Sequence, residues 1–528
     1  MGHYTIVREV RQSWLAPKLE YYYTEVVMSV DPTVCQNSVW ETIIGLEVHA
    51  QLMTRSKMFC GCPSDYQASD PNTRVCPVCI AMPGSLPVIN QQAVEFVIMT
   101  GLALNCSIAE TTHFDRKNYP YPDLMKGYQI SQYSNPIAST GWIELESSGI
   151  RRRVGITRAH LEEDVAKLQH VHNSSGESFS LLDVNRAGVP LMEVVGEPDI
   201  RSPEEAREYL IKMRSILQYL EVSSGDMEKG ALRCDANISI RPKGSLEFMP
   251  KVEVKNMNSL RAVFGALEYE FQRQIEVVEN GGIVAQETRG WVEDKGITVS
   301  QRSKEYAHDY RYFPEPDLPR LVILDTWVKS VSDKLPELPE PRKDRFISQY
   351  GLSSYDASLI TTVKSTAEFF EETLKVHEHS VNGLPLRAKG IANWISGESA
   401  RLVNQTGSDL VSSEMTPEKL SELMDLLDEG VIGSSQAKIV FEESFIHGDN
   451  PRSIVEKLGL AQVTNVDSMT PAIDKVLEEN SQAVSDYLAG KETAIKFLIG
   501  QVMKDTKGKA NPNLVSELLT SRLDSREL

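Results

Sequence analysis

The pattern of hydrophobic and polar positions divides the chain into two regions. Between about Thr42 and Leu324, short runs rich in β-branched residues alternate with helical stretches. The clearest amphipathic helix lies at residues 203–222, and strand-like runs lie at residues 42–52, 152–161, 232–242 and 250–258. The presence of both patterns in one region predicts a mixed α+β fold.

Beyond about Lys343 the pattern is almost entirely helical. The segment from Leu335 to Arg345 is dense in proline and charge, and proline disfavours a helical conformation in the residue before it. We therefore predict a linker here, followed by a helical region. Within that region, Thr416 followed by Pro417 is typical of the first residues of a helix.

The last predicted helix, within residues 491–512, is amphipathic. Apolar side chains recur with helical period at Ile495, Leu498, Ile499, Val502 and Met503. The other faces carry Lys491, Lys496, Lys504, Lys507 and Lys509. This pattern predicts one packed face and one locally basic face.

Length and composition indicate a protein of about two to four domains, because 528 residues with 41% hydrophobic content exceed what one core holds. No stretch approaches the roughly 20 apolar residues of a membrane helix. Residues 1–38 lack a secretory signal, and their carboxylates and scarce serine argue against a transit peptide. We interpret them as a poorly defined extension of a cytoplasmic protein, with an organellar origin as the alternative.

The net charge of −19 argues against a broad nucleic-acid-binding surface, because such a surface repels phosphates. A nucleic-acid site would have to be local. The five lysines of the last predicted helix are the candidate for it.

Three carboxylate-bearing runs are candidates for a metal site. Glu47 and His49 lie two residues apart in a predicted strand, so their side chains share one face, although a plain surface strand would look the same. Glu162 and Glu163 lie in an acidic run after His160, which is also typical of a solvated face. Glu193 lies among apolar residues, where a carboxylate is costly to bury without a compensating cation.

Such an oxygen-rich set suits Mg²⁺ bridged to nucleotide phosphates. No GxxxxGK[ST] loop occurs in the sequence, so any ATP site must use another scaffold.

A set of cationic, amide and aromatic residues could bind a polyanion such as ATP or an aminoacyl-tRNA end. Ordinary turn chemistry is an equally good explanation for any single one of them. The set comprises Arg116, Lys117, Asn118, Tyr128, Arg233, Asn237, Lys255 and Asn256.

Four of the seven cysteines are clustered, as Cys60-Gly-Cys62 and Cys76-Pro-Val-Cys79. Paired cysteines at this spacing can close a tetrahedral Cys₄ site on Zn²⁺, and such closed sites are structural. An alternative is that the cysteines and the carboxylates are two metal sites of a hydrolase. Cys35, Cys106 and Cys234 are predicted to be ordinary residues.

Nine motifs, in order, resemble the GatB family from about Trp40 to Leu528. They are IGLEVHAQL, PGSLPVIN, FDRKNYPYPDLMKGYQISQ, TRAHLEEDVAK, DVNRAGVPLMEVVGEPDIRSPEEA, GALRCDANISIRP, EVKNMNS, QETRGW and DYRYFPEPDLP. The resemblance implies a cradle-shaped amide-transfer domain at residues 39–330 with a zinc knuckle at 60–79, a helical domain at 331–440 and a YqeY-like tail at 441–528.

The resemblance also implies an activity. Members of this family work in a GatCAB complex, in which an amidase (the A subunit) supplies ammonia from glutamine and a small C subunit is also present. The B subunit phosphorylates the side-chain carboxylate of Glu-tRNA(Gln) or Asp-tRNA(Asn) with ATP and Mg²⁺, and ammonia then displaces the phosphate.

Carried over by motif, the metal positions are His49, one of Glu162 and Glu163, and Glu193, with Glu47 adjacent. The tail would contact the outer region of tRNA. The alternative is a tRNA-binding scaffold whose chemistry lies in a partner.

Overall fold

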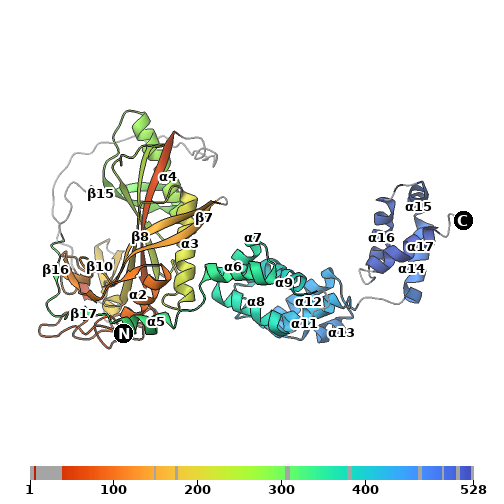
Figure 1. The fold of residues 1–528 in the computed structure, drawn as a ribbon, viewed down its shortest axis with the longest axis horizontal. Helices are drawn as coiled ribbons and strands as arrows, with labels where there is room; N and C mark the ends of the chain where they lie inside the picture. Colours follow the sequence, from red (N-terminus) through yellow and green to blue (C-terminus); the bar gives the residue numbers. More distant parts are fainter. Residues whose placement is uncertain are drawn as a thin grey trace. The chain divides into compact units, whose positions relative to one another are not determined.

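The computed structural model (Figure 1) divides the chain into two compact units, Met1–Leu338 and Pro339–Leu528. The α+β prediction is confirmed, because strands and helices are mixed in the first unit and the described part of the second is helical. The structure describes residues 5–7, 39–147, 150–172, 176–303, 310–376, 383–461, 466–489, 491, 493–506, 510 and 512–524.

A nine-stranded sheet forms the body of the first unit, in the order β15-β14-β13-β12-β2-β11-β8-β7-β3. All neighbours are antiparallel except β13 and β14. The central strands are β2 (Trp40–Gln51), β11 (Pro190–Gly196), β8 (Ile150–Glu163) and β12 (Leu232–Pro242). The flanking strands are β3 (Ser107–Ile108), β7 (Ala138–Ser147), β13 (Val252–Met257), β14 (Glu287–Val292) and β15 (Ile297–Ser303).

Three helices pack on one face of this sheet: α2 (Gln91–Ala103), α3 (Pro203–Tyr219) and α4 (Leu260–Glu279). Each helix is preceded by an N-cap residue whose side chain accepts a hydrogen bond from a backbone N–H of the first turn. These residues are Asn90, Ser202 and Ser259. Alternate residues of β2, such as Leu46 and Val48, are buried against these helices. The intervening residues of β2 therefore face the other side of the sheet, where the site lies.

Smaller elements border that second face. One three-stranded sheet joins β5 (Asp115–Asn118), β6 (Tyr128–Ser131) and β16 (Phe313–Pro314), and another joins β1 (Thr5–Val7), β10 (Ser178–Asp183) and β9 (Lys167–His172). Of the N-terminal extension, only Thr5–Val7 is described. The remaining elements are β4 (Thr111–Thr112), β17 (Leu321–Val322), η1 (Val184–Arg186), η2 (Glu293–Lys295) and α5 (Asp325–Ser332).

The second unit contains two separate hydrophobic cores. The first includes residues from Phe346 to Val455, and the second includes residues from Met469 to Leu523. The first core is built from α6 (Pro339–Tyr350), α7 (Ser354–Thr361), α8 (Lys364–Val376), α9 (Leu384–Asn393), η3 (Trp394–Ser399), α10 (Ala400–Thr406), α11 (Pro417–Asp428), α12 (Ser434–His447) and α13 (Pro451–Leu458). The second is built from α14 (Val466–Glu479), α15 (Ser481–Leu488), α16 (Thr493–Asp505) and α17 (Pro512–Asp524). Among the described helices, none is long and apolar enough to span a bilayer.

The linker predicted at Leu335 to Arg345 is wrong over most of its length, because α6 begins at Pro339. Proline is tolerated in the first turn of a helix, where its missing N–H has no partner to lose. The division after Leu338 leaves α5 in the first unit. Residue 440, expected to end the helical domain, lies inside α12, where Val440 and Phe441 are both buried in the first core. The core of the tail therefore starts with α14.

Candidate active site

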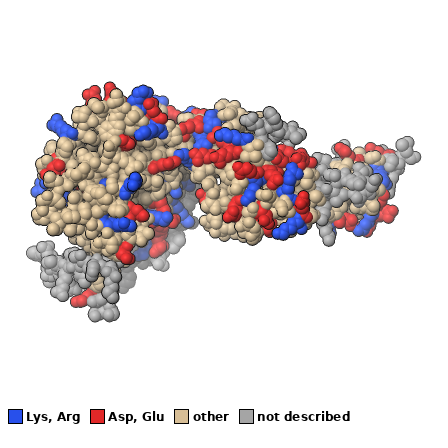
Figure 2. Space-filling model, turned by 90° about the horizontal axis from the view of Figure 1, so that it is seen from below, with Lys and Arg blue, Asp and Glu red and all other residues tan. Residues whose placement is uncertain are grey.

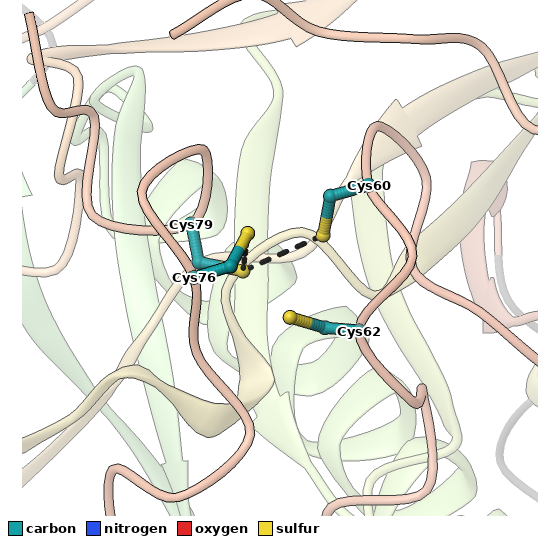
Figure 3. Close-up of side chains that lie close together, drawn as sticks. All are labelled: Cys60, Cys62, Cys76 and Cys79. Carbon is teal, nitrogen blue, oxygen red and sulfur yellow. Dashed lines mark hydrogen bonds between the residues drawn. The ribbon is translucent and has the colours of Figure 1, made fainter.

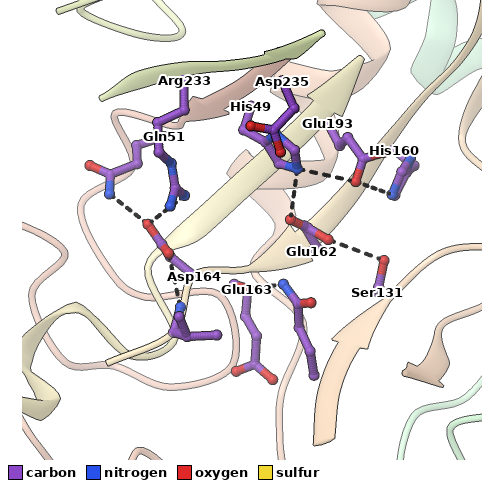
Figure 4. Close-up of polar contacts among 12 residues, drawn as sticks. His49, Gln51, Ser131, His160, Glu162, Glu163, Asp164, Glu193, Arg233 and Asp235 are labelled. Carbon is purple, nitrogen blue, oxygen red and sulfur yellow. Dashed lines mark hydrogen bonds and ion pairs between the residues drawn. The ribbon is translucent and has the colours of Figure 1, made fainter. Parts of the chain in front are cut away.

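Three neighbouring strands bring His49, Glu162 and Glu193 together on the face of the sheet that α2, α3 and α4 leave uncovered (Figure 4). On β11, Glu193 pairs in register with His49 of β2 on one side and His160 of β8 on the other. His49 Nε2 lies 3.3 Å from Glu193 Oε2 and 3.7 Å from Glu162 Oε1. One ligand atom from each of the three lies within 4.8 Å of the others.

A β-bulge places Glu162 on this face. Val154 and Ile156 of β8 lie in the core, but so do Ala159 and Leu161, which a regular strand would put on the opposite side. The register between β8 and β11 shifts at Val195/Gly196, so the alternation changes by one residue. As a result Arg158, His160 and Glu162 all face the site.

The two carboxylates of the cluster have pKa values shifted in opposite directions. Burial and the neighbouring charge of Glu193 raise the pKa of Glu162. Burial also raises the pKa of Glu193, but His160, His49 and Lys117 together lower it, and the net shift is downward. The site therefore holds one firmly ionised carboxylate beside one whose ionisation is disfavoured.

The two histidines also differ. Burial lowers the pKa of His49, but its hydrogen bond with Glu193 and the charges of Glu162, Glu193 and Asp235 outweigh that effect and raise it. Burial lowers the pKa of His160 to about 4, so His160 is neutral at pH 7. His160 Nε2 lies 3.6 Å from Glu193 Oε2. The sequence prediction did not single out His160 as a site residue, although its i, i+2 spacing to Glu162 was visible.

The donor set fits a divalent cation such as Mg²⁺. Two desolvated carboxylates and an imidazole converge, and a cation at their centre would favour the ionised form of Glu162. Of the sequence candidates, His49, Glu162 and Glu193 are thus brought together.

Glu163 points away from this cluster. Its carboxylate accepts hydrogen bonds from Lys126 Nζ (2.7 Å) and from the backbone N–H of Ile130 (3.0 Å). It lines a cavity of about 260 Å³ that Lys57 and Cys79 also line. The choice between Glu162 and Glu163, open at the level of the sequence, therefore falls geometrically on Glu162, because alternate strand residues face opposite ways.

Glu47 lies two residues before His49 on β2 and faces the same side of the sheet. It accepts a hydrogen bond from Asn237 Nδ2 (2.9 Å), and burial followed by the charges of Glu193 and Asp235 raises its pKa. Asp235 is directly opposite Glu47 in the ladder and is paired with Lys255 Nζ at 2.6 Å. Glu47, Asn237 and Lys255 therefore lie at the border of the cluster formed by His49, Glu162 and Glu193.

A third group of polar residues is centred on Asp164, which sequence reasoning did not select. Buried Asp164 accepts hydrogen bonds from Gln51 Nε2 (2.7 Å) and Arg233 Nη2 (3.0 Å), and Arg186 lies 3.7 Å away (Figure 4). Arg233, which was predicted to bind substrate, is thus held by the carboxylate of Asp164. Arg233 itself pairs with His49 in the β12–β2 ladder.

Most of the candidates on β5 and β6 have structural partners. Arg116 forms two hydrogen bonds with Glu315 (2.6 and 2.7 Å) and lies over the ring of Tyr128, 4.3 Å from its centroid. Asn118 donates to the backbone oxygens of Arg116 and Arg311. These contacts account for the residues as parts of the fold.

Lys117 differs from its neighbours. Burial lowers its pKa, but the charges of Glu162, Tyr119 and Glu193 raise it, with a net upward shift. It is therefore a cation close to the carboxylate cluster. Asn256, by contrast, is exposed and has a positive φ of 64°.

The four clustered cysteines turn their sulfurs toward one another from two loops (Figure 3). The Sγ atoms of Cys60 and Cys79 are 3.6 Å apart, and those of Cys76 and Cys79 are 3.8 Å apart. A regular tetrahedron with Zn–S bonds of about 2.3 Å has sulfurs about 3.8 Å apart. The arrangement therefore fits Zn²⁺, with all four positions taken by protein.

Lys57 lies beside this cluster. Its side chain is 0% exposed and its ammonium lies 3.5 Å from Cys79 Sγ and 3.5 Å from the carbonyl oxygen of Val184. The hydrogen bond with Cys60 and the charge of Lys57 lower the pKa of Cys79 to about 4. A thiolate is the form that binds zinc.

In the tail, α16 has the predicted amphipathic form. Leu498 and Val502 are fully buried, whereas Lys496 and Lys504 are exposed beside Phe497, which is 50% exposed. Lys491 is paired with Asp486 at 3.2 Å. Lys507 and Lys509 lie outside the described residues. Figure 2 shows acidic and basic side chains interspersed over the described surface in that view.

Comparison with known proteins decides the family. A family model described as the GatB/GatE catalytic domain matches residues 42–329, and one described as the GatB domain matches residues 368–523. The chain belongs to the GatB/GatE family. The resemblance seen in the motifs is thereby confirmed, and the catalytic-domain match includes all three residues of the cluster.

Several relatives of this GatB/GatE chain carry one name, which describes the B subunit of an aspartyl/glutamyl-tRNA(Asn/Gln) amidotransferase. The protein from Dehalococcoides mccartyi (strain CBDB1) is 53% identical over 487 residues, which cover 92% of this chain and 99% of the relative. The protein from Caldanaerobacter subterraneus subsp. tengcongensis is 52% identical over 484 residues, and that from Caldicellulosiruptor bescii is 49% identical over 488, with the same coverage.

Proposed function

We propose that the chain is the B subunit of a tRNA-dependent amidotransferase, which activates the side-chain carboxylate of Glu-tRNA(Gln), Asp-tRNA(Asn) or both with ATP. The observation that carries this proposal is the convergence of His49, Glu162 and Glu193 on one face of the sheet, within the region that matches the GatB/GatE catalytic domain. A carboxylate at neutral pH is a poor acyl donor, so it must gain a leaving group before an amide can form.

In the proposed reaction, an oxygen of the substrate's carboxylate attacks the γ-phosphorus of ATP and ADP leaves. Ammonia then attacks the carbonyl carbon of the acyl phosphate, and inorganic phosphate leaves. Mg²⁺ held by His49, Glu162 and Glu193 would neutralise the phosphate oxygens. Phosphoryl transfer needs positioning and charge compensation more than covalent chemistry from the protein.

The chain's own residues have distinct roles in this proposal. Glu193 stays ionised and orients both His49 and His160. Neutral His160 provides a rigid, uncharged support, since its pKa of about 4 keeps it unprotonated. Lys117 supplies positive charge near the transferred group. Asn237 and Lys255 hold the bordering carboxylates Glu47 and Asp235 in place.

The remaining parts of the proposal concern partners and structure. The relatives are named as one subunit of an amidotransferase, which supports a complex in which an amidase, the A subunit, supplies ammonia and a small C subunit completes the assembly.

Zn²⁺ at the four cysteines would stabilise the loops beside the sheet. The exposed strip Lys496, Phe497 and Lys504 of α16 would contact tRNA. We place the enzyme in the cytoplasm of a bacterial-type cell.

A scaffold role without chemistry is the second candidate, and the basic strip of α16 is the observation that favours it. It does not explain why two carboxylates and two histidines are buried against one another in the first unit. Buried ionisable groups arranged in this way are more typical of a reaction site.

The test is amidation of Glu-tRNA by the complex containing Glu193→Gln. We expect at least about a 100-fold loss of rate, because the substitution removes the charge that organises both histidines. Glu144→Gln is the matched control, since Glu144 is a partly exposed carboxylate of the same sheet, paired with Arg153. A Glu193→Gln complex that amidated at the control rate would refute the site assignment.

A further inference from the structure

Two cations beside the cluster have no carboxylate partner among the described residues: Arg158 and Lys117. Other cations of this face are paired, as Arg233 is with Asp164 (3.0 Å) and Lys255 with Asp235 (2.6 Å). Both side chains are partly buried, and a desolvated cation that forms no direct ion pair is costly for a folded protein. Its presence therefore calls for an explanation in terms of function.

Arg158 is held by aromatic rings instead of by carboxylates. Its guanidinium carbon lies 5.5 Å from the centroid of Tyr133, and Tyr133 stacks on Tyr312 with centroids 4.3 Å apart. Its Nε is buried and has no hydrogen-bond partner within the described part of the chain. An aromatic face can orient a guanidinium without neutralising its charge or using its N–H donors.

Lys117 is held in the same way. Its Nζ lies 5.1 Å from the ring centroid of Tyr310 and 5.8 Å from that of Tyr119. Tyr310 in turn packs edge-to-face against Tyr312, so one group of tyrosines contacts both cations. Both charges are therefore fixed in position and remain available to an anion.

The bulge in β8 is the reason that Arg158 faces the site. The register shift opposite Gly196 moves Arg158 to the same side as His160 and Glu162, where it pairs with Val195, two residues from Glu193 on β11. Bulges commonly re-aim a side chain beside an active site. Without it, the alternation set by Val154 and Ile156 would direct Arg158 into the core.

We propose that Arg158, oriented by the Tyr133–Tyr312 stack, is a substrate-binding residue that receives the reacting oxyanion with Lys117 beside it. This inference rests on the proposed function, which supplies two sources of that chemistry: the side-chain carboxylate of the aminoacyl group and the phosphates of the nucleotide. The planar fork of a guanidinium matches paired oxygens of either.

The test uses the complex with its partner subunits and the variants Arg158→Gln, Arg158→Lys and Arg153→Gln. Arg153 is the matched control, because it lies on the same strand, exposed and paired with Glu144 at 3.0 Å. Two constants are measured: the Kd of a non-hydrolysable ATP analogue and the KM for Glu-tRNA. Thermal unfolding of each complex is measured alongside.

We expect Arg158→Gln to raise one of the two constants about 10- to 100-fold, the range of a lost charged hydrogen-bond pair, and Arg158→Lys to restore it in part. A rise in the Kd identifies the nucleotide as the source of the oxyanion, and a rise in the KM identifies the aminoacyl carboxylate. Thermal stability should be unchanged or higher, because an unpaired cation is removed. If Arg158→Gln does not assemble, the same constants measured for Arg158→Lys decide.

Constants equal to those of Arg153→Gln would overturn the proposal, and so would a loss of stability with unchanged constants, which a purely structural arginine would give. A wild-type complex that amidates neither Glu-tRNA nor Asp-tRNA would instead refute the proposed function.

Discussion

His49 lies between two carboxylates, Glu162 and Glu193, whose pKa values are shifted in opposite directions. The hydrogen bond with His49 and the charges of His49 and Lys117 favour the ionised form of Glu193, whereas burial and the charge of Glu193 disfavour the ionised form of Glu162. A plain structural ion pair would not place a second buried carboxylate there. The arrangement is explained if a cation joins the three side chains.

Zinc binding by the cysteines makes a prediction at the residue scale. Cys76→Ser should remove about one tightly bound Zn²⁺ per chain, because a closed Cys₄ site loses a ligand. His49→Ala should leave that zinc in place, since His49 belongs to the other cluster. Metal analysis of the purified chain measures both.

The control for the cysteine variant is Cys106→Ser. Cys106 is buried apart from the cluster, and burial raises the pKa of its thiol to about 11, so it is not a thiolate ligand. Zinc that disappears in His49→Ala would support the hydrolase alternative instead.

Glu371 of α8 gives a prediction for pH dependence. Burial raises its pKa, but hydrogen bonds from Arg345, Arg342 and Tyr350 outweigh this and lower it to about 2. A depressed folded-state pKa stabilises the helical core above the unfolded value of 4.5, and that contribution is lost as pH falls toward 2. Glu371→Gln should therefore lower the free energy of unfolding by about 1 to 3 kcal/mol at pH 7 and by less at pH 3.

Hydrogen exchange of the amides of α6 and α8 measures this difference. Glu368→Gln, an exposed carboxylate of the same helix, is the control. A difference that stayed constant between pH 7 and pH 3 would contradict the assigned ionisation.

At the scale of elements, periodicity predicted the strands and helices that have one buried face. The sequence pattern predicted β2, β12, α3 and α16, because each of these elements packs one side against a core and leaves the other side unpacked. The i, i+2 spacing of Glu47 and His49 correctly placed both on one face, as their neighbours in the ladder show. The N-cap at Thr416 was also confirmed.

What the sequence could not provide was the consequence of irregular backbone. The bulge in β8 reverses the alternation in mid-strand, so the orientation of Arg158 and His160 could not be derived from strand period alone. The partners of Arg116 and Asp164 are far away in the chain, so neither their structural role nor the distinction between Glu162 and Glu163 was predictable from local pattern. The proline-rich α6 was missed because first-turn prolines resemble a linker.

The basic strip of α16 predicts a local tRNA contact. Lys496→Ala combined with Lys504→Ala should weaken tRNA binding and reduce the salt slope by about 1 to 2, because each lysine that contacts a phosphate releases a counterion. Lys475→Ala is the control, since its ammonium is already paired with Asp505 at 2.6 Å. Binding measured from about 50 to 200 mM salt tests this. An unchanged slope in the double variant would exclude the strip.

At the scale of the whole molecule, separate hydrophobic cores allow tRNA binding and nucleotide binding to be carried by different parts of the chain. The tail core starts at α14 and shares no residue with the core that ends at Val455. Deleting residues 462–528 should therefore weaken tRNA binding but leave binding of an ATP analogue unchanged. A cut after residue 440 is less suitable, because it would divide α12. Loss of nucleotide binding in the 462–528 deletion would contradict the separation of tasks.

The central claim is that the chain activates a carboxylate by phosphorylation, and oxygen transfer tests it directly. Glu-tRNA labelled with ¹⁸O in both oxygens of the side-chain carboxylate is amidated by the complex with unlabelled ATP and water. If an acyl phosphate forms, one labelled oxygen leaves with the phosphoryl group, so each inorganic phosphate should carry one ¹⁸O. Inorganic phosphate without the label, released in step with amide formation, would contradict the account.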